Sequence, residues 1–422
     1  MVLLFQKKEK FDIIIHRRFE MQLRLLNFYK FLSNFATSLV GTFIPLIIYK
    51  ATGSLRLAIV YLFCQCLSRL ICNHIFAKAY VKYPQLFLML RIIPLLIYNI
   101  FLIFIEQNLV LSLVFIIVCF GMNLSFKNNA NEILFNYSSS QKKSGKNLAM
   151  TRILECISSV VSTLAGGIFL DFNQTALIII SMVLYIISVM PIFIYFIVNR
   201  HTKGFNKDFV SNAVMAYEQD NVMSEKSKKL SRNMIINYFM IYMLFCLVDN
   251  FTNFYSLYLF IDEPTFTQAG YVNAVFNLSK MLSLVSVSWI AKKFDPYITS
   301  AVMAVLAGVA VVIIPLIQNY IGIYALFVVF GFGYEVGSYF MMQGIMSKAR
   351  IAGVANKTLL ARQDGIMVGQ MLSSLFVFIV NDLMPVFTFM LVGLIAFAIY
   401  DVIAENRMRK DLVNLLQNNE IE

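Results

Sequence analysis

Long apolar stretches follow one another at short intervals along nearly all of the 422 residues. A helix needs about 20 mostly apolar residues to cross a bilayer. One soluble core cannot bury so much apolar surface, so the pattern predicts a membrane protein with many spans. Twelve stretches satisfy the length requirement: residues 28–49, 55–76, 85–105, 108–130, 147–170, 174–198, 234–260, 267–291, 297–317, 321–346, 357–380 and 383–404.

The low charge content excludes most soluble classes of protein. Only 14% of the residues are Asp, Glu, Lys or Arg, whereas a soluble domain has about 25%. Ordinary soluble enzymes, disordered regulators and nucleic-acid-binding proteins therefore do not fit this chain. The formal net charge of +12 would suit a nucleic-acid partner, but the positions of the basic residues give it another explanation.

Basic residues gather on one side of the predicted spans. They occupy the amino-terminal segment, the loops near residues 78–82 and 142–146, the central loop 200–232 and the tail near 407–410. On the opposite side of the predicted spans, only the first loop is bordered by basic residues. The later loops on that side contain no Lys or Arg. The positive-inside rule then places both termini in the cytoplasm. Topology thus accounts for the positive charge, and we expect a lipid bilayer and no nucleic acid as partner.

No sequence pattern indicates a metal, a cofactor or a catalytic centre. Walker A, HExxH and GxSxG sequences are missing, and the three histidines are isolated. The cysteines lie inside apolar stretches without a CxxC pair, so we expect buried thiols rather than disulfides or a zinc site. The chain is therefore not expected to be an enzyme or to hold a cofactor or metal. These cysteines are Cys64, Cys66, Cys72, Cys119, Cys156 and Cys246.

The polar stretch 199–232 divides the twelve spans into two sets of six. Arg152 and Arg362 occupy matching positions near the starts of the fifth and eleventh spans. This match fits two parallel halves related by an axis along the membrane normal. The predicted divisions are a cytoplasmic amino-terminal segment (1–27), a first six-helix half (28–198), a cytoplasmic linker (199–232), a second six-helix half (233–404) and a cytoplasmic tail (405–422).

With this layout the chain resembles the major facilitator superfamily over nearly its whole length. The turn Thr52-Gly53-Ser54 is similar to one that is common in the exporter branches of that family. The loop 77–84 takes the place of the family's Gly-x-x-x-Asp-Arg loop and keeps its basic charge, without the glycine and the aspartate. Gly166-Gly167 matches the end of the antiporter motif, where small residues allow helices to approach closely. The resemblance implies an all-α membrane protein with twelve transmembrane helices in two six-helix halves around a central cavity.

Ionisable residues within the spans indicate a functional region, since each costs at least ~2.5–3.5 kcal/mol inside a bilayer. They fall mainly on the spans that line the cavity in the architecture implied by the resemblance. Glu335 and Asp249 are candidates for proton coupling, with Lys280 as a competing partner. Glu155 is a third candidate and lies one turn from Arg152, so we expect those two to pair. The alternative is a permanent structural ion pair between spans.

Further polar and aromatic residues on the same spans are candidates for lining the substrate cavity. By contrast, Arg91 lies on the third span, outside that set, and we expect it to extend to the cytoplasmic edge. The candidates for the substrate cavity are Lys280, Asn34, Asn250, Asn277, Tyr255, Tyr334, Arg152 and Arg362.

Together these features predict a secondary active transporter of the plasma membrane that works by alternating access. The mixture of charges and aromatic residues favours a small amphipathic organic substrate, and the resemblance to exporter motifs favours proton-coupled efflux by an antiporter, acting as a monomer. Three alternatives remain: a proton-coupled importer of a metabolite, a lipid or glycolipid flippase, and a membrane sensor that transports nothing.

Overall fold

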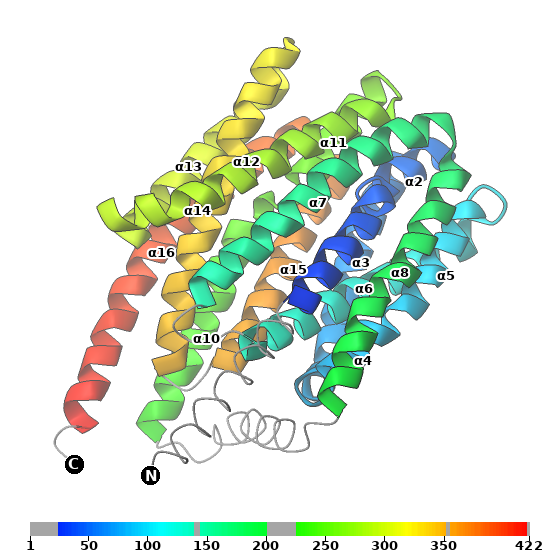
Figure 1. Cartoon of the computed structure of the whole chain (residues 1–422). Helices are drawn as coiled ribbons and strands as arrows, with labels where there is room; N and C mark the ends of the chain where they lie inside the picture. The colour runs from blue at the N-terminus through cyan, green and yellow to red at the C-terminus, as the bar shows by residue number, and fades with distance from the viewer. Residues whose placement is uncertain (1–23, 139–143, 201–224, 352–354, 420–422) are drawn as a thin grey trace.

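The computed structural model describes residues 24–138, 144–200, 225–351 and 355–419. These residues form a bundle of long, tilted helices (Figure 1). Eleven of the described helices are long and apolar enough to cross a membrane, and α12 (Phe266–Lys293) is of comparable length, with 28 residues. The predicted all-α membrane fold is thereby confirmed. The predicted spans agree to within a few residues with the apolar segments of these helices, although several helices continue beyond them, as α16 does to Asn419.

The first half of the bundle is built from the helices that precede the linker. Its first helix covers residues 24–41. The other helices of this half are α2 (Ile44–Thr52), α3 (Leu55–Lys82), α4 (Pro84–Leu90), α5 (Ile92–Ile103), α6 (Leu109–Ser138), α7 (Ser144–Phe172) and α8 (Gln174–Arg200).

The second half follows the linker, of which residues 201–224 lie outside the described part of the chain. The last residues of the predicted linker already belong to α10. The elements of this half are α10 (Glu225–Phe245), η2 (Cys246–Val248), α11 (Phe251–Asp262), α12, α13 (Pro296–Ile313), η3 (Ile314–Leu316), α14 (Tyr320–Ile351), α15 (Ala355–Val380) and α16 (Met384–Asn419).

Three spans are interrupted within the bundle. The first span breaks at Thr42-Phe43, just before α2. Pro45 lies in the first turn of α2, where its missing N–H group could not have continued the preceding helix. The third breaks at Arg91, between α4 and α5, and the seventh at Asp249-Asn250, between η2 and α11. Irregular backbone at membrane depth is tolerated only inside protein or beside a water-filled space. Two of the three breaks therefore draw attention to an ionisable residue, the buried Arg91 and the partly buried Asp249.

The turn Thr52-Gly53-Ser54 connects two helices by local capping. Gly53 has a positive φ of 64° and ends α2 in the left-handed conformation, which glycine adopts without strain. The Ser54 hydroxyl accepts a hydrogen bond from the backbone N–H of Leu57 and caps the start of α3. Gly53 thus ends α2 and Ser54 begins α3, which gives the glycine and the serine of this turn a structural role.

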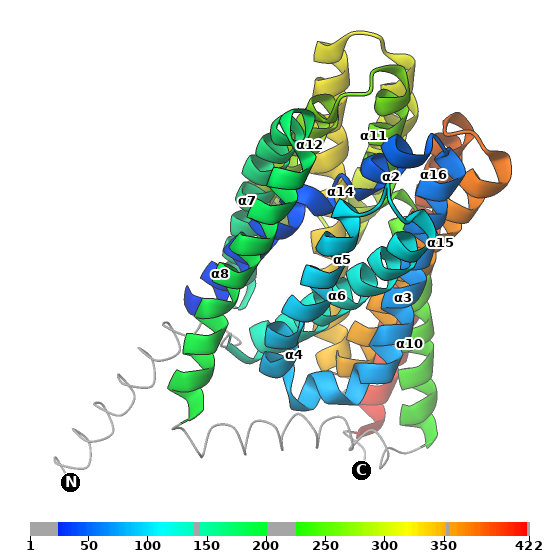
Figure 2. The same ribbon diagram turned by 90° about the vertical axis from the view of Figure 1, so that its right-hand side faces the viewer.

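The two halves meet mainly along α7 with α12 and along α3 with α15. Figure 2 shows α7 and α12 side by side at one edge of the bundle. A Cβ atom added at Gly167 would lie 2.7 Å from the carbonyl oxygen of Phe266, and one added at Gly270 would lie 2.7 Å from that of Thr163. Only glycine allows the backbones to approach so closely. Of the glycine pair predicted from sequence, Gly167 lies at this contact between the halves, whereas Gly166 packs against Leu39 within the first half.

Polar contacts between the halves also occur at the upper end of Figure 1, opposite the end where α10 begins and α16 ends. The Asp171 carboxylate, at the end of α7, accepts hydrogen bonds from the backbone N–H groups of Phe266 (2.9 Å) and Thr267 (3.0 Å). Asp171 thus caps the amino terminus of α12 from the other half of the protein. Arg56 of α3 donates to Asn381, just after α15 (3.1 Å).

Candidate functional site

Glu335 of α14 holds two cations inside the bundle. Its side chain is 5% exposed, and its Oε1 lies 2.7 Å from Nη1 of Arg152, on α7. Its Oε2 lies 3.5 Å from Nζ of Lys280, on α12. We call these three residues the ion triad. Because α7 belongs to the first half and α12 and α14 to the second, one of the two ion pairs joins the halves and the other lies within the second half.

Asp249 lies beside the triad at the break in the seventh span. Its carboxylate accepts hydrogen bonds from the hydroxyl of Tyr334, on α14, and from Nε2 of Gln370, on α15 (3.1 Å). Tyr334 also places its ring 5.6 Å from Nζ of Lys280. Among the described residues, no cation lies within ion-pair distance of Asp249. A proton could therefore bind Asp249 without breaking an ion pair, which is not true of Glu335.

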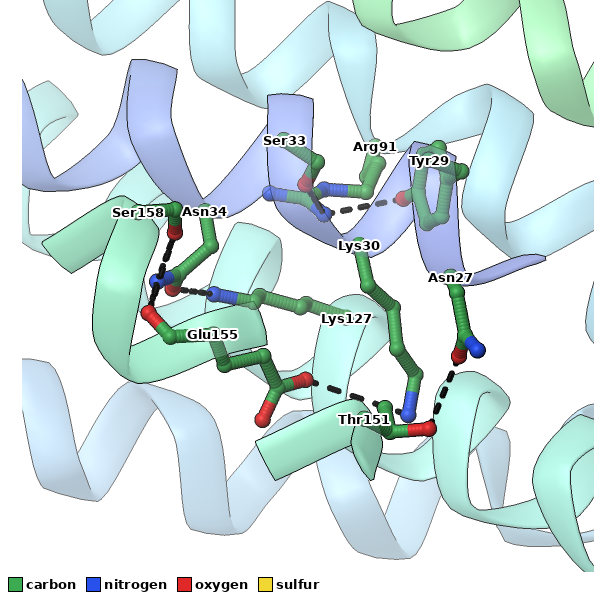
Figure 3. Close-up of polar contacts among 10 residues, drawn as sticks. All are labelled: Asn27, Tyr29, Lys30, Ser33, Asn34, Arg91, Lys127, Thr151, Glu155 and Ser158. Carbon is green, nitrogen blue, oxygen red and sulfur yellow. Dashed lines mark hydrogen bonds and ion pairs between the residues drawn. The ribbon is translucent and has the colours of Figure 1, made fainter. Parts of the chain in front are cut away.

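A second group of charges lies within the first half (Figure 3). Nζ of Lys30, on the first helix, is 3.8 Å from Oε1 of Glu155, on α7. Lys127 of α6 donates a hydrogen bond to Oδ1 of Asn34 (2.9 Å). The Asn34 amide in turn donates to the carbonyl oxygen of Glu155 (2.9 Å) and to Oγ of Ser158 (2.8 Å). We call Lys30, Asn34, Lys127 and Glu155 the amino-terminal cluster.

Helix α7 connects the two groups of charges. Arg152 belongs to the ion triad, and Glu155, one turn later, belongs to the amino-terminal cluster. The Glu155 side chain remains 33% exposed, so the cluster is not sealed inside the protein. An arginine and a carboxylate with different partners thus lie one turn apart on α7, and the arginine reaches a carboxylate of the other half.

The position of Arg91 corrects the expectation that it extends to the membrane edge. Arg91 is 2% exposed and donates hydrogen bonds to the Tyr29 hydroxyl (2.9 Å), the Ser33 hydroxyl (2.6 Å) and Oδ1 of Asn123 (3.0 Å). These oxygens replace water around the guanidinium group, so the side chain does not need to reach the surface. Its partners lie on the first helix and α6, which the sequence of the third span cannot reveal.

The expected pair of Arg152 with Glu155 is also wrong. Arg152 extends to Glu335 in the other half, and Glu155 contacts Lys30 of the first helix instead. A spacing of three residues permits a pair on one helix, but it does not exclude better partners on neighbouring helices. The correction matters because it turns a local contact into one that joins the two halves.

Two of the residues predicted to line the substrate cavity, Asn250 and Asn277, donate hydrogen bonds from their side-chain amides to groups within the second half. Nδ2 of Asn250 donates to the carbonyl oxygen of Gln370 (3.0 Å) and to the Ser374 hydroxyl (3.1 Å), which fixes the break in the seventh span against α15. Nδ2 of Asn277 donates to the carbonyl oxygen of Asn273, one turn earlier on α12 (2.8 Å). Neither amide contacts the ion triad through these bonds.

Two further candidates pack against aromatic rings. Tyr255 is 1% exposed and stacks on Phe251, with a distance of 5.9 Å between ring centroids. Arg362 lies over the ring of Tyr242, 5.3 Å from its centroid. The matching arginines of the two halves therefore have different partners, since Arg152 contacts a carboxylate across the interface and Arg362 contacts a ring of α10.

Two lysines of the amino-terminal cluster are not among the residues that the sequence predicted to line the substrate cavity. They are Lys30 and Lys127. Lys30 lies just inside the predicted span 28–49, and a lysine inside an apolar span is costly. That cost is a signal that could have placed Lys30 among the candidates. Lys127 carries the same signal, but its depth near the end of the fourth span favours a place at the membrane surface.

The described residues offer no cluster for a metal ion. Within residues 24–138, 144–200, 225–351 and 355–419, no group of three or more His, Cys, Asp or Glu side chains could hold one. The described cysteines are all free thiols. The carboxylates of the site can bind protons and form charge pairs with lysine and arginine.

Comparison with known proteins gives a family match and similar folds. A family model described as Major Facilitator Superfamily matches residues 26–361. No curated protein matches the chain. The inward-facing crystal structure of a bacterial homologue of the iron transporter ferroportin is similar, with a TM-score of 0.66 at 13% identity over 91% of this chain and 98% of that chain.

Two more solved structures share the fold. The same ferroportin homologue in its outward-facing state has a TM-score of 0.63 at 13% identity, over 92% of this chain and 99% of that chain. The E. coli fucose:proton symporter FucP has a TM-score of 0.56 at 11% identity, over 92% of this chain and 99% of that chain. At these identities the likeness to the solved structures shows the fold alone.

Proposed function

The chain belongs to the major facilitator superfamily, and we propose that it is a secondary active transporter that moves a small organic molecule by proton-coupled alternating access. In this proposal the protein lies in the plasma membrane with both termini in the cytoplasm, and it works as a monomer. The observation that carries the proposal is the ion triad, in which one buried carboxylate holds a cation from each half.

Alternating access requires the two halves to move relative to each other around the substrate. The pair of Arg152 with Glu335 joins the halves, so it must break or rearrange when they separate at this depth. Lys280 lies in the same half as Glu335 and can remain in contact throughout. The triad therefore allows Arg152 to leave without exposing an unpaired carboxylate, which would be costly inside the bundle.

The proximity of Asp249 to the triad supports the proposed proton coupling. Tyr334 donates to Asp249 and precedes Glu335 on α14, so a change in the charge of either carboxylate acts on the same turn of that helix. In our proposal a proton binds one of these carboxylates during one half of the cycle and leaves during the other. The carboxylates that we propose for this role are those of Glu335, Asp249 and Glu155.

The substitution Glu335→Gln tests this proposal, because it removes the charge and keeps the size of the side chain. We expect reconstituted Glu335→Gln protein to lose accumulation of substrate driven by a pH gradient, measured with a panel of organic compounds and a trapped pH-sensitive dye. The exposed Glu106→Gln variant is the matched control. Normal gradient-driven accumulation by Glu335→Gln would remove this residue from the coupling mechanism.

Export is the direction that we propose, and the resemblance of the turn Thr52-Gly53-Ser54 to exporter sequences supports it. An importer would have the same contacts at the site. Flux in inside-out and right-side-out vesicles with a gradient imposed in either sense separates the two directions. Accumulation only in inside-out vesicles agrees with export, and accumulation only in right-side-out vesicles contradicts it.

A further inference from the structure

The charged groups around α7 contain more cations than carboxylates. Among the described side chains of the amino-terminal cluster, Lys30 and Lys127 accompany the single carboxylate of Glu155. In the ion triad, Arg152 and Lys280 accompany the single carboxylate of Glu335. Each group thus has two cations for one carboxylate. Asp249 is near enough to attract Lys280, and it removes only part of this surplus.

Buried positive charge increases further with Arg91. This guanidinium group is held by neutral oxygens of tyrosine, serine and asparagine, as described above, and its Nη2 is buried without a hydrogen-bond partner. No carboxylate among the described residues forms an ion pair with Arg91. The interior of the first half therefore keeps a positive charge that its own described carboxylates do not neutralise.

Lys127 shows the consequence of this surplus most clearly. Its ammonium group donates to the neutral amide of Asn34, while Arg91 and Lys30 are near enough to repel it and Glu155 attracts it. A lysine at membrane depth is costly, and like charges nearby increase that cost. A neutral side chain would serve the packing of α6 better, so the lysine indicates an anionic partner that does not belong to the described chain.

Cations of both halves lie against one turn of α7. Lys127 reaches this turn through Asn34, which donates to the carbonyl oxygen of Glu155. Lys280 of the second half is held beside the same turn by Glu335, whose other carboxylate oxygen contacts Arg152. An anion bound at the turn from Arg152 to Ser158 would therefore be attracted by a lysine from each half.

We propose that the substrate is an organic anion whose negative group binds against this turn of α7, between Lys127 and Lys280. That the bound anion is a substrate depends on the proposed transport function, whereas the presence of an anion site does not. The positive surplus disfavours a cationic drug or a divalent metal ion, because a cation would add to the repulsion. It also disfavours a neutral molecule, which would leave the surplus unchanged.

Thermal unfolding of the purified full chain in detergent tests the anion site without any transport. The anionic probes are succinate, benzoate and glucose 6-phosphate, and glucose, tetraphenylphosphonium and Mn²⁺ are the neutral and cationic probes, all at constant ionic strength set with sodium chloride. We expect at least one organic anion to raise the Tm in a saturable manner, since binding to the folded state stabilises it. Glucose, tetraphenylphosphonium and Mn²⁺ should leave the Tm unchanged.

Charge substitutions then locate the site. We expect Lys127→Gln and Lys280→Gln each to weaken binding of the stabilising anion about tenfold or more, because a desolvated charge partner is lost. Lys127→Arg keeps the charge and should retain most of the affinity, which covers the case in which Lys127→Gln does not fold. Lys82→Gln is the matched control, since Lys82 is exposed at the end of α3, and it should bind as the unchanged protein does.

The outcomes separate this inference from the proposed function. Saturable binding of an anion that is lost in both glutamine variants, without flux of that anion in proteoliposomes, supports the site and contradicts the transport proposal. Flux of a neutral or cationic compound together with no stabilisation by any of the three anions overturns the inference and leaves the transporter in place. Equal anion binding by the unchanged protein and by both glutamine variants also overturns it.

Discussion

At the scale of single residues, Arg91 shows that neighbouring helices decide the role of a charged side chain. From sequence it is an arginine a few residues from a membrane edge, whereas in the structure three oxygens of other helices surround it. Sequence alone identified Glu335, Asp249 and Lys280 as unusual, because their cost in a membrane depends only on their own type and depth. It did not identify their partners, because partner choice depends on how the helices pack.

The buried position of Arg91 predicts that lysine cannot replace it. An ammonium group lacks the planar fork that allows one arginine to donate to Tyr29, Ser33 and Asn123 together. We expect Arg91→Lys to destabilise the protein by about 1–3 kcal/mol, since a buried polar group loses its partner, and thermal unfolding in detergent measures the change. The exposed Arg232→Lys serves as control, and an equal Tm for both variants would contradict this account of Arg91.

At the scale of helices, the contact of α7 with α12 depends on backbone approach at Gly167. A methyl group there would meet the carbonyl oxygen of Phe266, which is backbone and cannot move aside as a side chain can. We expect Gly167→Ala to lower the stability by about 1–3 kcal/mol through overpacking. Gly337→Ala is the matched control because its added methyl group would find its nearest atoms at 3.4 Å. A Gly167→Ala protein with the unchanged Tm would show that the helices separate easily.

The cap that Asp171 provides for α12 predicts a local effect on amide exchange. Without the carboxylate, the N–H groups of Phe266 and Thr267 lose their acceptor. We expect Asp171→Ala to speed hydrogen exchange at these two amides and to favour separation of the halves at this end. The amide of Met384, which Asp382 caps in another loop, should not change. Unchanged protection of Phe266 in the variant would mean that other contacts hold this end closed.

The helices themselves could be predicted well from sequence, but not all of their interruptions could. The length of each apolar stretch determines a span, and Gly53 and Pro45 mark local ends and starts of helices. Pro94 is a comparable signal for the break at Arg91, because it has no N–H group to donate to the carbonyl oxygen of Leu90. No such residue marks the break at Asp249, which depends on contacts with another helix, such as the bonds from Asn250 to α15.

At the scale of the whole molecule, sequence predicted the fold because two global patterns are independent of packing detail. Apolar stretches determine how many times the chain crosses the membrane, and the distribution of Lys and Arg predicts its orientation. The site was predicted less completely. The ion triad and the amino-terminal cluster each combine residues of several helices, and the expected pair of Arg152 with Glu155 failed for that reason.

The charge of the proposed substrate predicts that its transport responds to voltage. Moving one elementary charge through a potential of 100 mV changes its free energy by about 2.3 kcal/mol, so an inside-negative potential favours exit of an anion. We expect a potassium diffusion potential, negative inside, to speed anion efflux from proteoliposomes at equal pH on both sides. Efflux that does not respond to the potential would require compensating charge movement and contradict net export of negative charge.

Helix α7 contacts the other half near both of its ends, through Arg152 toward the lower end and through Asp171 at the upper end. These residues are separated by about 28 Å along the helix at 1.5 Å per residue. A stiff rod that pivots between two such points moves its ends in opposite directions. Both contacts are formed together in this structure, so the loss of either one would leave α7 attached to the other half at a single point, about which the helix is free to swing.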